Sequence, residues 1–245
     1  MNGITNKGLL FFGIFISIGL ILTGSIGAYT YYQSKRLGNV VTVTGSAQEN
    51  ITSDIIKWKT SFSRTVTPDN VKQGYIEMQS DYKIVGKYLV DNGIPKNETV
   101  IGQVNLVPVY NYYNGGQTLT NYTLVQRIEV QSSDIEKINE VGKRAGVELA
   151  NLGVIFSDDA EEYYYSKFAD LKVEMLTEAT KNAKDRAEKI AESTGAQIGD
   201  LQSASMGVFQ VTAVNSTDLS DYGTYDTAAI EKQVTAVVKT SFNLK

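Results

Sequence analysis

The chain contains neither histidine nor cysteine, and these two absences exclude more chemistry than any motif in it. Ser-His-Asp and Cys-His nucleophilic catalysis, histidine general acid–base catalysis and Cys/His zinc sites all need residues that are missing. Thiolate redox chemistry and disulfide bonds are excluded for the same reason. Only carboxylates, lysine, tyrosine and hydroxyl groups remain as candidates for catalysis.

The chain also lacks an excess of positive charge. Its 23 basic residues are scattered among 27 acidic ones, which gives a net charge of −4, whereas binding to nucleic-acid phosphates needs clustered lysine and arginine. No glycine-rich phosphate loop of the type Gly-x-x-x-x-Gly-Lys is present. We therefore expect no nucleic-acid partner and no nucleotide cofactor.

An uncharged, strongly apolar segment stands near the N-terminus. No charged residue occurs between Gly8 and Ser34, and residues 9–28 are rich in Leu, Ile and Phe. This length is sufficient to cross a hydrocarbon layer of about 30 Å as a helix. The tyrosines that follow, Tyr29, Tyr31 and Tyr32, suit a membrane–water interface. Residues 1–36 are accordingly predicted to be a membrane anchor.

A cleaved signal peptide is the alternative for this segment. Ser25 and Gly27 provide small residues at the −3 and −1 positions ahead of Ala28. The apolar stretch is longer than the roughly 7–15 residues of a typical signal sequence, which favours retention as an anchor. Orientation does not follow from charge, because one lysine precedes the segment and Lys35 and Arg36 follow it.

Residues 37–245 are predicted to form one α+β domain with an antiparallel sheet and helices packed on one face. Alternation of apolar and polar residues predicts strands at 41–47, 56–66, 100–106, 122–130, 201–214 and 233–244. Apolar residues at helical spacing predict helices from Pro68 to Gly93, over 135–149, and over 158–194. Polar stretches at 110–120 and 215–227 are predicted to be a hairpin loop and a long loop.

Two of these helices carry apolar stripes that we expect to face the core. The first consists of Val71, Tyr75, Met78, Tyr82, Val85 and Leu89. Core packing is favoured over a coiled coil there, because the stripe is short and Gly74 and Gly86 interrupt the helix. The second consists of Phe168, Leu171, Met175, Leu176, Ala179, Ala183, Ala187 and Ile190. On the outer face of this second helix, Lys181 and Asp185, Lys184 and Glu188, and Asp185 and Lys189 stand four residues apart, as on a solvated surface.

The most concentrated acidic group is formed by Asp158, Asp159, Glu161 and Glu162. Oxygen-rich clusters can bind Ca²⁺, but the spacing does not match an EF-hand loop. We favour a structural interpretation, in which Ser157 caps the long helix and the acidic side chains stabilise its first turn through the helix dipole. No metal site is predicted.

Tyrosine-rich stretches offer aromatic contact area for a partner, since tyrosine is enriched at interfaces. They consist of Tyr110, Tyr112 and Tyr113 and of Tyr163, Tyr164 and Tyr165, although ordinary packing explains at least half of them. Asn-x-Thr triplets begin at Asn50, Asn97, Asn121 and Asn215, and these accept glycans only in a host with the necessary enzymes.

Several short motifs resemble the SIMPL family, a domain of unknown function. They are VTVTGSA at residues 41–47, KNAKDRAEKIA at residues 181–191, the following Gly195, and GDL at residues 199–201. The resemblance covers residues 40–244. Two departures are Ser53-Asp54, where the family usually has Pro-Asp, and Asn121-Tyr122, where it often has Gly-Tyr.

The resemblance implies an exported protein, periplasmic or surface-exposed, with an antiparallel sheet backed by helices and a tendency to self-associate. It implies no established catalytic position, so we expect no catalytic, cofactor-binding or metal-binding residues. The chain is expected to act without catalysis, as a homo-oligomer or through an envelope protein partner. The alternative is a carboxylate-based envelope hydrolase or a small-ligand-binding protein, for which Asp158 and Asp159 are the residues to test.

Overall fold

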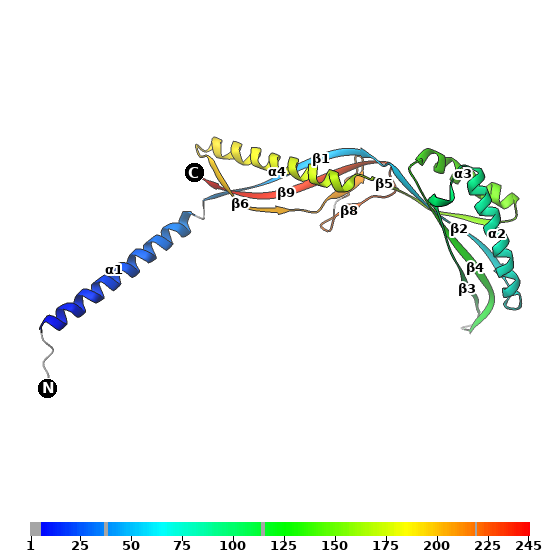
Figure 1. Ribbon diagram of the computed structural model, residues 1–245, viewed down its shortest axis with the longest axis horizontal. Coiled ribbons are helices and arrows are strands. Elements are labelled where there is room, and N and C mark those ends of the chain that lie inside the picture. Colours follow the sequence, from blue (N-terminus) through cyan, green and yellow to red (C-terminus); the bar gives the residue numbers. More distant parts are fainter. Residues whose placement is uncertain (1–5, 37–38, 114–115, 219) are drawn as a thin grey trace, which may run out of the picture. The chain divides into compact units, whose positions relative to one another are not determined.

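The computed structural model describes residues 6–36, 39–113, 116–218 and 220–245 (Figure 1). These residues fall into two compact units. Of the described residues, the first unit combines 6–36, 39–47, 175–207 and 236–245, and the second combines 48–113, 116–174, 208–218 and 220–235. Strands β1 (Val40–Thr52) and β9 (Glu231–Leu244) and helix α4 (Phe168–Ser193) contribute residues to both units.

The N-terminal helix α1 (Asn6–Arg36) is apolar over most of its length. Its stretch Leu10–Tyr32 has a mean hydropathy of 2.1 and is long enough to cross a membrane, a property that signal sequences share. Ser17, Thr23 and Thr30 donate their hydroxyl hydrogens to carbonyl oxygens four residues earlier, at 2.6–2.8 Å. The helix therefore satisfies these polar groups internally, as an apolar surrounding requires.

The first unit packs an alanine-rich helix directly on a strand. Within this unit β9 neighbours β1 and pairs antiparallel with β6 (Ile198–Met206). Ala179, Ala183 and Ala187 of α4 are fully buried, and Ala183 and Ala187 pack with Val41, Val43 and Phe242. A Cβ placed on Gly45 of β1 would lie 2.2 Å from the carbonyl oxygen of Ala179. The glycine and the alanines are thus needed for close approach of helix and strand.

The second unit is built on a four-stranded antiparallel sheet in the order β3-β4-β2-β5. The strands are β2 (Ile55–Val66), β3 (Thr99–Tyr113), β4 (Gly116–Ser132) and β5 (Ile155–Tyr164). Helices α2 (Val71–Asp91) and α3 (Ile135–Asn151) pack on one face, with 3₁₀ turns at Pro68–Asn70 and Lys96–Glu98. This arrangement confirms the predicted α+β class with helices on one face of an antiparallel sheet.

Alternating side chains of the sheet meet the helices in one hydrophobic core. From β2 and β4 come Ile56, Trp58, Phe62, Leu124, Ile128 and Val130; from the helices come Met78, Val85, Leu89, Ile138, Val141, Ala145 and Leu149. The opposite face of β2 carries the polar residues Lys57, Lys59 and Ser63. A further part of this unit pairs β7 (Gln210–Ala213) with β9 and with the two-residue β8 (Thr224–Tyr225).

Four of the predicted elements differ from those in the structure. Residues 155–164 form strand β5, and α4 begins only at Phe168, because pairing of this segment with β2 overrides its resemblance to a capped helix start. The predicted loop at 110–120 is mostly strand, with β3 running to Tyr113 and β4 beginning at Gly116. The strand predicted over 201–214 is divided into β6 and β7, and the predicted loop over 215–227 includes β8.

The two apolar stripes are confirmed only in part. Tyr75 and Tyr82 are 42% and 45% exposed, and the buried face of α2 contains Gly74, Asp81 and Tyr88 instead. In α4 the side chain of Ile190 is exposed and Ala191 is buried. Asp81 is buried because Arg64 of β2 pairs with it through two hydrogen bonds, of 2.5 and 2.8 Å, which a search for apolar residues does not detect.

The predicted helix ends and one charge pair are confirmed. Gly93 and Gly195 have φ angles of 78° and 75°, the left-handed conformation that follows a helix and favours glycine. On α4, Lys184 and Glu188 form an ion pair at 3.6 Å.

Candidate functional site

The predicted acidic group lies on strand β5, and neighbouring carboxylates point to opposite faces of the sheet. Asp158 accepts a hydrogen bond of 2.9 Å from the indole N–H of Trp58, on the face that the helices cover. Asp159 accepts one of 3.3 Å from the hydroxyl of Ser61, on the other face. Since no helix begins at Ser157, the predicted capping role of these residues is wrong.

The other two acids of β5 are also held by local partners. Tyr163 donates a 2.7 Å hydrogen bond to Glu161, and burial together with this contact raises the pKa of Tyr163 to about 12. Lys59 donates a 2.6 Å hydrogen bond to Glu162 and lowers the pKa of that carboxyl. Across the residues that the structure describes, no three acidic side chains gather in an arrangement that could hold a metal ion.

The predicted tyrosine-rich stretches differ in their surroundings. Tyr163 is buried, and Tyr164 stacks on Tyr225 with 6.0 Å between ring centroids, so both belong to the packed interior or its margin. Tyr110 and Tyr112 on β3 are 40% and 73% exposed. The side chain of Tyr113 lies outside the described residues. Only the stretch on β3 therefore presents aromatic surface of the kind expected for a partner.

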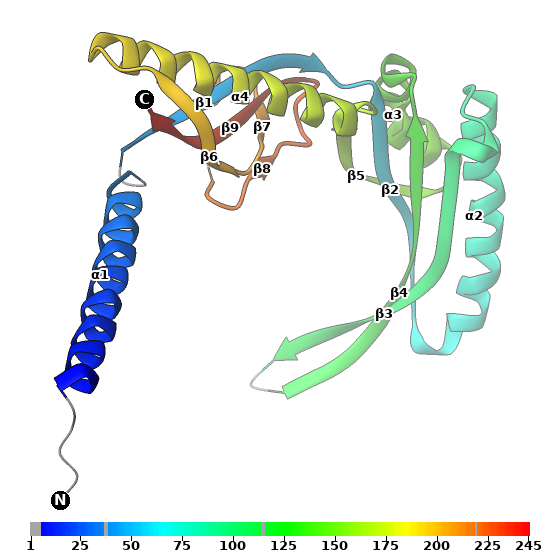
Figure 2. The same ribbon diagram turned by 60° about the vertical axis from the view of Figure 1, so that its left-hand side comes forward.

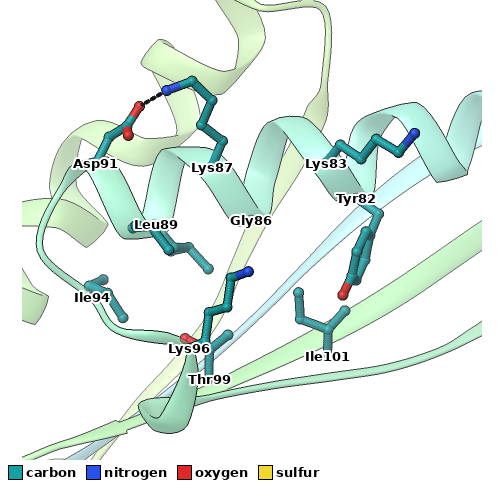
Figure 3. A pocket seen from close by; sticks show the side chains of 11 residues that line it. Tyr82, Lys83, Gly86, Lys87, Leu89, Asp91, Ile94, Lys96, Thr99 and Ile101 are labelled. Atoms are coloured by element: carbon teal, nitrogen blue, oxygen red, sulfur yellow. Dashed lines mark hydrogen bonds and ion pairs between the residues drawn. The ribbon is translucent and has the colours of Figure 1, made fainter.

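A groove runs between helix α2 and strand β3, and we call it the α2–β3 groove. It consists of two adjoining cavities of about 540 and 580 Å³, both of which reach Tyr82 and Lys83. Figure 3 shows the ring of Tyr82 beside Ile101 of β3, and Leu89 and Ile94 at the other end of the first cavity. The second cavity continues along α2 to Ile76 and Tyr75. The groove floor is therefore mainly apolar.

Lysines give the α2–β3 groove a positive rim. Lys83, Lys87 and Lys96 line the first cavity, and Asp91 is its one acidic lining residue. Lys87 pairs with Asp91 at 2.6 Å, as the dashed line in Figure 3 marks. Within the described part of the chain, Lys83 and Lys96 form no ion pair. The ammonium groups of Lys83 and Lys96 are therefore available to pair with acidic groups of a partner.

The outer edge of β3 borders the groove. Among the described strands β3 pairs with β4 alone, so half of its backbone N–H and C=O groups point away from the sheet. β2 accompanies β4 only as far as Tyr122, so residues 109–113 and 116–121 form a two-stranded ribbon. Figure 2 shows this distal part of the hairpin curving away from α2.

The sequence did not predict this site. Tyr75 and Tyr82 continue the helical spacing of Met78 and Val85, which predicts a core position for both. The available signal was their chemistry, since a tyrosine among aliphatic residues keeps a polar end that prefers water. The position of β3 at the sheet edge could not be read from its own residues.

The antiparallel sheet with two helices on one face, together with a long alanine-rich helix and a closing strand, defines an α+β domain. The sequence model of SIMPL, described as "Protein of unknown function (DUF541)", matches residues 41–242. The chain belongs to the SIMPL family. A comparison with curated proteins finds no match.

Proposed function

We propose that this protein is an exported, membrane-anchored protein that acts by binding other protein chains, further copies of itself in particular, and not by catalysis. The observation that carries this proposal is the outer edge of β3. It has no strand partner among the described residues, and among its described side chains β3 exposes six large apolar ones: Val100, Leu106, Val107, Val109, Tyr110 and Tyr112.

A long exposed edge of this kind is a template for pairing with another chain. Natural sheets usually protect such edges with charges, bulges, proline or a covering element. Residues 105–113 of β3 contain no charged residue, and the protective features they have are Pro108 and an irregularity in the pairing with β4 between Val109 and Tyr110. The distal ribbon also has only two strands, which is marginal for independent stability in water. A protein partner along β3 would pair the exposed edge and add a third strand to the ribbon.

Location outside the cytoplasm is part of the proposal. The helix α1 is apolar enough to anchor the chain. The resemblance to the SIMPL family implies an exported domain, which supports this part of the proposal. A paired-carboxylate hydrolase is not proposed, because Asp158 and Asp159 point to opposite faces of the sheet.

The test is the mass in solution of the full chain in a mild detergent, measured by light scattering over a concentration series. We expect a discrete multiple of the protomer mass after subtraction of the detergent. Val107→Thr combined with Val109→Thr keeps β-branched residues on the strand but removes apolar surface, so we expect a lower mass. A monomer at every concentration, together with no crosslinked partner in cells, would contradict the proposal.

A further inference from the structure

We propose that copies of this chain associate head to tail through the second unit, with β5 of one copy adding to the outer edge of β3 of the next. In this arrangement the acidic side chains of β5 meet the lysines of the α2–β3 groove. The inference rests on the proposed self-association and assigns its two surfaces, which are the opposite edges of a single sheet.

Strand direction permits this addition. In the order β3-β4-β2-β5 every neighbouring pair is antiparallel, so β3 and β2 run one way and β4 and β5 run the other. A second copy in the same orientation therefore places its β5 antiparallel to β3. The sheet continues across the boundary with the pairing it already has, and the helices of both copies lie on the same face.

Charge favours this pair of edges over a symmetric one. Asp158, Asp159 and Glu161 of β5 form no ion pair within the described residues, and neither do Lys83 and Lys96 of the groove. Asp158 and Glu161 lie on the helix-covered face, where the groove also lies. Pairing β3 with a second β3 would instead bring two lysine-rimmed grooves together, and like charges would oppose it.

The length of the α2–β3 groove agrees with the length of the open edge of β5. The groove follows α2 from Tyr75 to Asp91, which at about 1.5 Å per residue is roughly 24 Å. On β5 the backbone N–H of Tyr163 already donates to the carbonyl of Thr227, so the open edge is residues 155–162. At about 3.3 Å per residue this edge is roughly 26 Å long. The open part of β5 therefore matches the groove.

The helix layer also has room for the next copy. α2 packs over β2 and β4, while α3 packs over β5, where Gly142 lies against Trp58 and Glu161. With strands about 4.8 Å apart, adding β5 beside β3 places the next α3 roughly 12 Å from α2, which is wider than the roughly 8–10 Å between packed helices and therefore avoids a clash. Gly146 and Ala150 follow Gly142 at four-residue steps and are exposed, so this face of α3 permits close approach.

Because the two surfaces differ, each copy offers one free edge at either end. Such a heterologous contact produces a closed ring if the rotation between copies closes, and a filament if it does not. Both forms cover residues 99–106 of β3 and the open edge of β5 in every internal copy.

The absence of cysteine makes the contact directly testable in the full chain. Gln103→Cys and Asn105→Cys place thiols on β3, and Ser157→Cys and Ala160→Cys place them on β5, all at exposed positions. A disulfide needs Cα atoms about 4.4–6.8 Å apart. After oxidation in detergent we expect disulfide-linked dimers when a β3 variant is mixed with a β5 variant, and a ladder of multimers when one chain carries both thiols.

Three results would overturn the inference, and light scattering on the same samples separates them. Dimers from a β3 variant alone would indicate symmetric edge pairing. A multimer without any β3–β5 disulfide across the four variants would leave the proposed function standing and remove only this contact. A monomer would remove both.

Charge reversal gives a second measurement that does not need a thiol in register. Lys83→Glu with Lys96→Glu should lower the assembled fraction several-fold at low salt, since rim charges steer and hold such contacts. Lys181→Glu with Lys189→Glu on α4 makes the same change in net charge at exposed positions and should leave assembly unchanged. Equal losses in both variants would contradict the assigned surface.

Discussion

Substitution of Gly45 by alanine should destabilise the first unit severely although it adds a single methyl group. The new Cβ would lie 2.2 Å from the carbonyl oxygen of Ala179 and 2.4 Å from the backbone nitrogen of Ala183. Both atoms belong to the backbone of α4 and cannot rotate away. Relief requires the helix to move by about 1 Å, which disturbs the packing of Ala183 and Ala187 against Val41.

Overpacking typically lowers the free energy of unfolding by about 1–3 kcal/mol, and a clash with helix backbone belongs at the upper end of this range. That is a large part of the roughly 5–15 kcal/mol that stabilise a domain. The assay is chemical unfolding of the full chain in detergent, followed by hydrogen exchange at β1 and α4. Thr44→Ala, one residue away on the exposed face, is the matched control and should change little. A free energy of unfolding for Gly45→Ala within about 0.5 kcal/mol of the parent would refute the reasoning.

Two further predictions concern charged groups in the second unit. Arg64→Met should lower the free energy of unfolding by about 3 kcal/mol, because it leaves the buried carboxylate of Asp81 without its cation; the double variant Arg64→Met, Asp81→Leu should recover most of the loss in urea unfolding. Lys232 is fully buried, and burial lowers its pKa although the nearby Asp226 acts in the opposite direction. Between this lowered pKa and the ordinary value of 10.5 the unfolded chain binds the proton more strongly than the folded chain does. The free energy of unfolding should therefore rise with pH in that window. Lys232→Met should abolish that rise with pH, whereas an unchanged pH profile would contradict this assignment.

Most of the fold could be predicted because the spacing of apolar residues and the glycines that end helices indicate the same elements. β1, β2 and α3 follow the alternation or the helical spacing of their apolar residues, and Gly93 and Gly195 mark helix ends. These features depend on neighbours within a few residues, which is the range that pattern analysis covers.

The failures occurred where distant partners decide the structure. Residues 155–164 contain a serine followed by two aspartates, which is typical of a helix start, but pairing with β2 makes them a strand. Asp81 lies in the buried face of α2 only because Arg64, seventeen residues earlier, reaches it. The α2–β3 groove needs both α2 and the edge position of β3, and the order of strands in a sheet is not encoded in any one segment.

Hydrogen exchange of the full chain in detergent, compared between high and low protein concentration, tests most directly whether strand edges mediate assembly. The account predicts that backbone amides of β3 around residues 99–106 and of β5 around residues 155–162 exchange more slowly at high concentration, together and in proportion to the assembled fraction. Amides of the central strands β2 and β4 should not change. Equal exchange of β3 and β5 at all concentrations, while the chain is multimeric, would contradict the account.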